Sequence, residues 1–308
     1  MADRQRTVAV VGAGVIGQVY AGRLAAAGHQ VWLLARGATF AALSSHGVRL
    51  RTNGMSSAPA VTVVDSPADV PAVDVVYLAV RADQVDSALP VLAQIHAPVV
   101  VTLVNLADRA DAVATTIGAD RVVIGFAGVG GSRTAEGVTY QEIGQQATTI
   151  GRAGGREDGV VADLRATGLT VDVVADMTAW LATHTIFIAG VSAAILEAGG
   201  SGTLGNDRAR TNRMVLAVRE GFAALSHHSV TPTPTPLSAI FTVVPRIISV
   251  PYWQRQMRGD LGRLSLSPHV LATRDSELPH LATAARRITR DSPRLDAALT
   301  AAGLPSDP

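Results

Sequence analysis

The chain opens with a glycine pattern that can bind a dinucleotide. Gly12, Gly14 and Gly17 stand at G-x-G-x-x-G spacing, directly after the apolar run Val8–Val11 and before a predicted helix. In this context the first glycine permits a tight turn, the second lets the backbone approach a pyrophosphate, and the third allows helix and strand to pack closely. The N-terminus of the helix adds unpaired N–H groups and a positive dipole end for the phosphates. The pattern therefore predicts a nicotinamide dinucleotide site.

The residue after the second apolar run indicates which dinucleotide is bound. The run Val31–Ala35 is followed by Arg36, and no Asp or Glu stands nearby. An acidic side chain at this place would hydrogen-bond the ribose 2′-hydroxyl of NAD, whereas arginine accommodates the 2′-phosphate of NADP. We therefore predict NADPH as the cofactor. The alternative for Arg36 is a solvated surface arginine.

The elements that must position these residues follow from the apolar pattern. Uninterrupted Val, Ile and Leu runs separated by helical patterns predict a parallel sheet covered on both faces. From about Met177 the strand-like runs stop and helical periodicity takes over. We predict an α/β fold: an N-terminal Rossmann domain at 1–176 and an all-helical domain at 177–308 for substrate binding or dimerisation, with the active site in the cleft between them. The predicted strands are 8–11, 31–35, 73–80, 98–105, 121–128, 147–152 and 170–176.

Composition narrows the range of partners. A net charge of +1 and 4% aromatic residues argue against nucleic acid or an acidic membrane as partner, and the absence of cysteine excludes thiolate chemistry and disulfides. The apolar stretch Thr185–Leu196 is shorter than the roughly 20 residues that a bilayer requires, so a buried core helix is expected. His227 and His228 lack a third ligand, and no metal is expected. We expect a cytoplasmic protein with a small-molecule substrate, and the sequence leaves room for a homodimer.

Several segments are similar to one family. The opening GAGVIGQVYAGRLAAAGHQVWLLARG, the strand end LAVRADQ and the strand end TLVN resemble the ketopantoate reductase family, closely in the first half of the chain and loosely in the second. The resemblance implies that Arg81, which replaces a lysine, supplies positive charge to a cofactor phosphate. It also implies that Asn105 touches the nicotinamide ribose or the substrate, although Leu106 stands where glycine is usual. A turn-forming asparagine is the alternative for Asn105.

The catalytic half departs from the family pattern. The family signature is W-x-K-x-x-x-N with a second asparagine four residues later, in which the lysine is the general acid and the asparagines hold the substrate. Anchoring on Trp180 places Ala182, Ile186 and Gly190 at these positions, on one helix face. The whole chain contains no lysine. We therefore expect a site that is larger and less polar than the family's, and a bulkier or less polar substrate.

Two other side chains are candidates for the roles of the missing lysine and asparagines, which are proton transfer and substrate binding. His184 lies in a W-L-x-x-H pattern that resembles divergent family members, and histidine is suited to general acid work near neutral pH. It lies two residues from the lysine position, about 200° around an ideal helix, and a core or interface histidine is the alternative. Glu277 best matches a family glutamate on a late helix, with His269 eight residues before it. The alternative for Glu277 is a solvated helix face shared with Arg274.

These observations predict NADPH-dependent reduction of a carbonyl compound, with the proton coming from His184, His269 or water. The alternative is a protein that binds NADP(H) without reducing a ketone, such as a redox-neutral enzyme, an imine or alkene reductase, or a cofactor-sensing module. The predicted catalytic residues are His184, Glu277 and Asn105. The predicted cofactor-binding residues are Gly12, Gly14, Val15, Ile16, Gly17, Arg36, Arg81 and Asn105.

Overall fold

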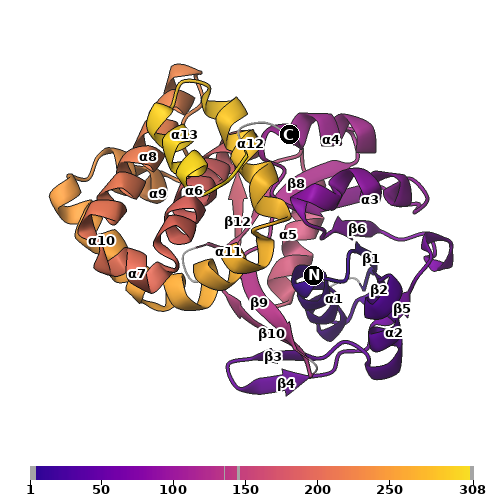
Figure 1. Cartoon of the computed structure of the whole chain (residues 1–308). Coiled ribbons are helices and arrows are strands. Elements are labelled where there is room, and N and C mark those ends of the chain that lie inside the picture. Colours follow the sequence, from indigo (N-terminus) through magenta and orange to yellow (C-terminus); the bar gives the residue numbers. More distant parts are fainter. Residues whose placement is uncertain (1–4, 135, 144–145, 306–308) are drawn as a thin grey trace. The chain divides into compact units, whose positions relative to one another are not determined.

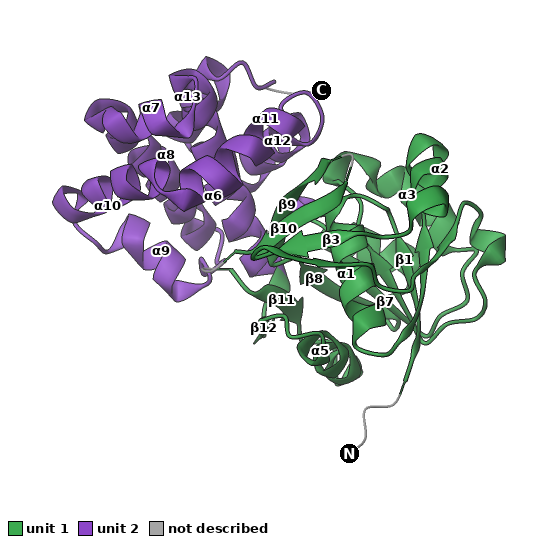
Figure 2. Cartoon of the chain, turned by 90° about the horizontal axis from the view of Figure 1, so that it is seen from below, with its two compact units in different colours: residues 1–105, 110–177 green, residues 106–109, 178–308 purple. Residues whose placement is uncertain are grey.

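The computed structural model of the chain describes residues 5–134, 136–143 and 146–305. Two compact units divide the chain, shown in separate colours in Figure 2. The first, here called the sheet unit, comprises Met1–Asn105 and Ala110–Met177, and the second, the helical unit, comprises Leu106–Arg109 and Thr178–Pro308. The predicted class, an α/β nucleotide-binding fold followed by a helical region, is confirmed.

An eight-stranded sheet forms the centre of the sheet unit, with strand order β12-β11-β8-β7-β6-β1-β2-β5 (Figure 1). Its strands are β1 (Thr7–Val11), β2 (Gln30–Leu34), β5 (Thr62–Val64), β6 (Val75–Leu78), β7 (Val99–Leu103), β8 (Val122–Phe126), β11 (Thr148–Gly151) and β12 (Val171–Val174). All seven predicted runs form strands. The expectation of a wholly parallel sheet is wrong at one end, because β11 pairs antiparallel with β8. A run of buried residues indicates a strand but carries no information about its direction.

Helices cover this sheet because each crossover between parallel strands returns along a face. α1 contacts β1 and β2, α2 contacts β5, α4 contacts β8, and α5 contacts β11 and β12. The buried core beneath them includes Val8, Val10 and Tyr77, each with no exposed surface. The helices are α1 (Val15–Ala26), α2 (Gly37–His46), α3 (Val85–Leu92), α4 (Ala110–Ile117) and α5 (Arg156–Ala166).

A second, four-stranded sheet was not predicted. Its order is β4-β3-β10-β9, and it contacts α1. The strands are β3 (Leu50–Thr52), β4 (Met55–Ser57), β9 (Val129–Thr134) and β10 (Gly137–Glu142). Leu50 packs closely on Gly22 of α1, where an added Cβ would lie 2.6 Å from the Leu50 Cδ1 atom. Two of these strands have three residues each, too few to show an alternating pattern.

Tyr20 connects α1 to the surrounding strands. Its buried hydroxyl lies 2.6 Å from Thr148 Oγ1 and accepts a hydrogen bond from the Gly128 N–H at 3.2 Å. Burial is the main cause that raises the pKa of Tyr20 to about 12, so the hydroxyl stays protonated. The first helix of the glycine motif is therefore held by both packing and hydrogen bonds.

The helical unit is built around α6 (Met177–Ala198). The other elements are α7 (Ser201–Asn206), α8 (Arg208–His227), α9 (Thr235–Thr242), α10 (Arg246–Arg258), the π-helical turn η4 (Leu261–Leu266), α11 (Ser267–Thr273), α12 (Glu277–Thr289) and α13 (Pro293–Ala301). α6 has 22 residues and is long and apolar enough to cross a membrane, so the length estimate from the sequence was too short. Its most apolar window is 94% buried, as in the core helix of a folded domain.

A short segment after β7 belongs to the helical unit. It forms the turn η3 (Ala107–Arg109), which contacts α12, and Ala107 is buried in the core of the helical unit. Arg287 of α12 forms an ion pair with Asp108, with 3.2 Å between Nη1 and Oδ2. The chain thus passes from the sheet unit to the helical unit directly after Asn105 and returns at Ala110.

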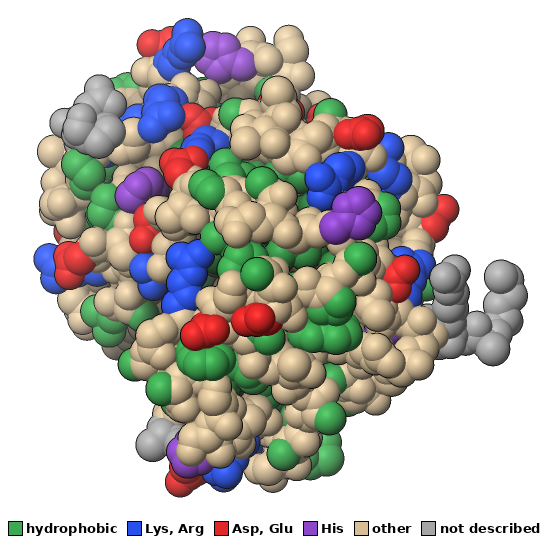
Figure 3. Space-filling view, turned by 90° about the vertical axis from the view of Figure 1, so that its right-hand side faces the viewer, with side chains coloured by type: hydrophobic (Ala, Val, Ile, Leu, Met, Phe, Trp, Pro, Cys, Tyr) green, Lys and Arg blue, Asp and Glu red, His purple; other side chains and the backbone are tan. Residues whose placement is uncertain are grey.

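The surface carries both signs of charge. Figure 3 shows basic and acidic side chains interspersed over the face it presents, with hydrophobic side chains between them. This distribution agrees with a formal net charge of +1. Any charge-dependent binding must therefore come from local arrangements of side chains.

Candidate functional site

The glycine motif forms a loop that accepts no side chain at two of its three positions. Gly12 has φ +107°, and an added Cβ there would lie 2.5 Å from the Ala79 carbonyl oxygen. A Cβ at Gly17 would lie 1.7 Å from the Gly12 carbonyl oxygen. By contrast, a Cβ at Gly14 would meet nothing within 4 Å. Gly14 is thus required by neither conformation nor packing, and its bare backbone faces open space that a ligand can approach.

The first turn of α1 offers donors beside this open position. Gly14 is the N-cap residue, no side chain caps the helix, and the first turn contains no acidic residue. Val15 and Ile16 follow, both partly exposed. Because the first N–H groups of a helix have no partner within it, this end is suited to an anion. Gln18, which the sequence analysis missed, supports the loop by donating from Nε2 to the Ala13 carbonyl at 2.9 Å.

The two arginines predicted to bind cofactor phosphates differ in their surroundings. Arg36 lies two residues beyond β2, is exposed, and its guanidinium has no hydrogen bond or ion pair within the described part of the chain. Arg81 is held by Asp83 through two contacts, Nε to Oδ1 at 3.0 Å and Nη2 to Oδ2 at 3.2 Å. The positive charge of Arg81 is therefore already compensated. Arg36 is the cation that remains available to a phosphate.

Asn105 lies two residues beyond β7 and is buried. Nearby, Ala107 has φ +50°, a left-handed conformation that costs a residue with a Cβ about 1 kcal/mol. The turn that follows Asn105 is thus slightly strained. Strain of this kind often occurs at functional sites, and it keeps Asn105 a candidate for ligand binding.

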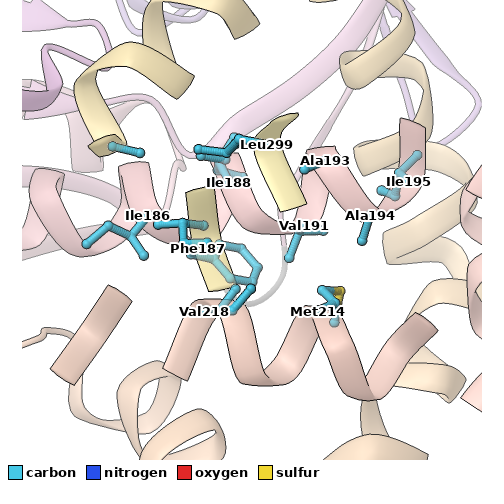
Figure 4. Packing of buried hydrophobic residues seen from close by; sticks show 14 of the residues in the cluster. Ile186, Phe187, Ile188, Val191, Ala193, Ala194, Ile195, Met214, Val218 and Leu299 are labelled. Atoms are coloured by element: carbon cyan, nitrogen blue, oxygen red, sulfur yellow. The ribbon is translucent and has the colours of Figure 1, made fainter. Parts of the chain in front are cut away.

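The helix face predicted to replace the family's polar residues is a packing face. Ile186 has no exposed surface, and a Cβ added at Gly221 of α8 would lie 2.5 Å from its Cγ2 atom. A Cβ at Gly190 would lie 2.7 Å from Val218 Cγ2, also on α8. Figure 4 shows Val218 of α8 directed toward the α6 side chains. The expectation that these positions enlarge a substrate site is therefore wrong, because spacing shows which residues share a face but not what covers it.

His184 is buried and stacked. Its ring lies on that of Trp180, with centroids 5.0 Å apart and planes 8° apart, and a tilted contact joins it to Phe187. Burial, together with the charge of His269, lowers the pKa of His184 to about 3. A general acid that works near neutral pH needs a pKa in that range, and burial moves the pKa of His184 below it. At neutral pH the ring is an uncharged imidazole, which can donate one hydrogen bond and accept another.

Glu277 and His269 lie on separate helices, since α11 ends at Thr273 and α12 begins at Glu277. The Glu277 side chain is buried, which contradicts the alternative of a solvated helix face. It lies in the first turn of α12. His269 is exposed, and its charge is close enough to affect His184.

A family model described as ketopantoate reductase PanE/ApbA matches residues 8–155. The match covers the nucleotide-binding part of the chain, which is therefore similar to the ketopantoate reductase family. The family consists of oxidoreductases that act on a keto or hydroxyl group. A comparison with curated proteins found no match.

Several solved structures share the fold of this chain. A PanE/ApbA family ketopantoate reductase from Ralstonia eutropha JMP134 is 21% identical, with a TM-score of 0.78 over 97% of each chain. The 2-dehydropantoate 2-reductase from Methylococcus capsulatus is 19% identical, with a TM-score of 0.74 over 96% of this chain and 94% of its own. A D-mandelate dehydrogenase with NADH and anilino(oxo)acetate is 14% identical, with a TM-score of 0.73 over 96% and 97%. At these identities the likeness concerns the fold.

Proposed function

We propose that this protein is an NADPH-dependent reductase of a carbonyl compound less polar than ketopantoate. The observation that carries the proposal is the loop from Gly12 to Gly17. Two of its glycines are required by the packing of the loop itself, while Gly14 leaves room beside an uncapped helix N-terminus. That combination fits a pyrophosphate, which needs close backbone approach and N–H donors.

The proposed cofactor rests on residues that follow β1 and β2. The N–H groups at Val15 and Ile16 would receive the pyrophosphate, and the free guanidinium of Arg36 would receive the 2′-phosphate. The D-mandelate dehydrogenase of similar fold is named with NADH, so the fold alone does not select the cofactor. Arg36 is the residue of this chain that favours NADPH.

The reduced nicotinamide, when bound, supplies a hydride to an electrophilic carbon. The chain must orient the reactants and bring a proton to the oxygen. Neutral His184 has no extra proton to give at neutral pH, so its role would be a hydrogen bond from a rigidly held ring. His269 or water remains as the proton source. We assign to Asn105 and Glu277 the binding and orientation of substrate.

We propose a substrate less polar than ketopantoate because two hydroxyl groups of α6 already donate hydrogen bonds within the helical unit. Thr183 donates to the Ala179 carbonyl at 2.8 Å and accepts from the Thr233 N–H at 3.0 Å. Thr185 donates to the Leu181 carbonyl at 2.8 Å. These donors are used within the helical unit, and no lysine is present to add another. α6 therefore offers little to a substrate rich in oxygens. The close packing of Gly190 removes the argument for a bulkier substrate.

A second candidate is NADPH binding without reduction of a ketone. The neutral state of His184 and the lack of lysine favour it, because both remove a strong proton donor. An imine or an activated alkene develops charge differently from a ketone. Reduction of an imine or an activated alkene therefore needs a proton donor of different position or strength than reduction of a ketone.

Steady-state oxidation of NADPH separates these readings. The panel is ketopantoate, phenylglyoxylate, a cyclic imine and an activated alkene, each with NADPH and with NADH. We expect reduction of a less polar carbonyl compound and a preference for NADPH. Tight NADPH binding by calorimetry without turnover of either keto acid would instead support the second candidate. Absence of NADPH binding would refute both.

A further inference from the structure

The sheet unit contains a pocket that the proposed reaction does not use. It has a volume of about 340 Å³ and lies among α2, the beginning of α1 and the second sheet. The glycines of the dinucleotide motif do not line it. Its polar and charged lining residues are Gln18, Thr39, His46, Arg49, Arg133, Thr134 and Glu136.

Strand register directs Arg133 into this region. Val138 of β10 pairs with Leu50 of β3 and with Arg133 of β9, so the three residues form one row across the sheet. Side chains in such a row project from the same face. Leu50 and Val138 are buried in the core of the sheet unit. Arg133 is at the open end of the row, and its Nη1 donates to Thr39 Oγ1 of α2 at 3.1 Å.

The pocket has more positive charge than its own residues neutralise. Within the described ranges, neither Arg49 nor Arg133 forms an ion pair with a carboxylate. The carboxylate of the pocket, Glu136, lies 3.3 Å from Arg51. Arg51 pairs in register with Thr139 and is not among the residues that line the pocket. Arg51 therefore offsets Glu136, and the charges of Arg49 and Arg133 remain.

Gln18 gives the pocket a buried polar wall. Its side chain is 3% exposed, and one amide hydrogen is used by the Ala13 carbonyl. An amide retains a second N–H and a carbonyl oxygen for other partners. The guanidinium group of an arginine can bind two phosphoryl oxygens at once. A hydroxyl group and an amide can hydrogen-bond the other polar atoms of the ligand. We propose that this pocket binds a phosphate monoester, with Arg49 and Arg133 on the phosphoryl oxygens and with Gln18 and Thr39 as neutral contacts.

The test is calorimetric titration of the full chain with glycerol 2-phosphate. We expect Arg133→Ala and Arg49→Ala each to weaken binding by roughly tenfold or more, because each loses a charge-assisted hydrogen bond. Arg263→Ala is the matched control, because it removes an exposed arginine of the helical unit that does not line the pocket, and its affinity should stay within twofold. No binding by the parent chain at millimolar concentration, or equal affinities in all variants, would overturn the proposal.

Two sources could present this chemistry, the 2′-phosphate of the cofactor and a separate metabolite. If saturating NADPH abolishes glycerol 2-phosphate binding, and Arg133→Ala weakens NADPH but not NADH, the cofactor is the source. If glycerol 2-phosphate binds equally well to the NADPH-saturated chain, the ligand is separate. The pocket does not depend on the proposed reductase activity. A chain that binds the probe through Arg49 and Arg133 but fails to bind NADPH would overturn the proposed function alone.

Discussion

Trp180 and His184 lie one helical turn apart on α6, and their rings stack with 5.0 Å between centroids and 8° between planes. The contact continues through Phe187 to Phe241 and Trp253, with centroid distances of 5.9 and 5.5 Å. His184 thus lies between Trp180 and Phe187 within an aromatic cluster. The cluster fixes the ring and removes it from water, and burial lowers the pKa of His184 far below the usual range.

The first prediction concerns the pH dependence of stability. The pKa of His184 is about 3 in the folded chain and about 6.5 when unfolded. The unfolded chain therefore binds more protons between these values. The contribution of His184 to the free energy of unfolding is therefore complete above about pH 6.5. It decreases by up to about 1.4 kcal/mol per pH unit as the pH falls toward 3.

His184→Phe keeps an aromatic ring but removes the titration, so its unfolding free energy should fall less steeply from pH 6.5 to pH 4 than that of the parent. Urea unfolding at several pH values measures the slope. His228→Phe, at an exposed position, is the control and should keep the parent slope. Identical slopes in the parent and His184→Phe would show that His184 is not held neutral.

The second prediction concerns cofactor choice. Arg36→Ala should weaken NADPH binding by roughly tenfold or more, because a charge-assisted contact to the 2′-phosphate is lost. NADH has no such phosphate, and its affinity should change less than twofold. Calorimetry on the parent, Arg36→Ala and the control Arg51→Ala measures the effect. Equal affinities for NADPH and NADH in the parent chain would contradict the assignment.

The third prediction distinguishes the glycines of the loop. Gly14 has φ −73° and open space at its Cβ position, so Gly14→Ala should fold with an unchanged melting temperature. The added methyl occupies the approach to the helix N-terminus, and NADPH affinity should fall at least tenfold. Gly17→Ala should lose both stability and binding, because its Cβ would overlap the Gly12 carbonyl. Gly202→Ala, another open glycine, is the control, and an unchanged NADPH affinity in Gly14→Ala would refute the proposed binding mode.

Features of the fold that depend on residues close together in the sequence could be predicted, and features that depend on distant residues could not. The strands of the large sheet were predictable because buried runs are local patterns, and the loop at Gly12 was predictable because its spacing reports a local backbone turn. The packing of Ile186 against α8 was not, since it depends on a partner many residues away. The low pKa of His184 was unpredictable for the same reason, because burial is a property of the fold. The pocket at Arg133 follows from strand register, which no sequence pattern in the short strands reveals.

The fourth prediction concerns the buried carboxylate. If Glu277 orients the substrate, Glu277→Gln should reduce turnover of the true substrate at least tenfold and leave NADPH affinity unchanged. Melting temperature and kcat are measured together on the parent and the variant. Glu220→Gln on α8 is the control, since Glu220 is half-buried and pairs with Arg294. A loss of stability without a specific loss of turnover would assign Glu277 a structural role.

The fifth prediction goes against the family name. We expect kcat/KM for ketopantoate and NADPH to fall below about 10⁴ M⁻¹s⁻¹, the lower end of the usual enzyme range. The chain has no lysine, the Thr183 and Thr185 hydroxyls are used within the helical unit, and His184 is neutral at the pH of the assay. Removing a general acid alone typically costs about 10²–10⁴-fold.

Ala182→Lys tests the same point directly. Anchoring on Trp180 gives Ala182 the position of the family's lysine, yet Ala182 is buried in the core of the helical unit. A lysine there would bury an unpaired charge, so the variant should lose stability without gaining ketopantoate reduction. The controls are the parent chain and Ala182→Met, which adds similar length without charge. Efficient ketopantoate reduction by Ala182→Lys would mean that this position faces the reacting atoms, and reduction by the parent at or above the usual range would mean that another group already serves as the proton donor.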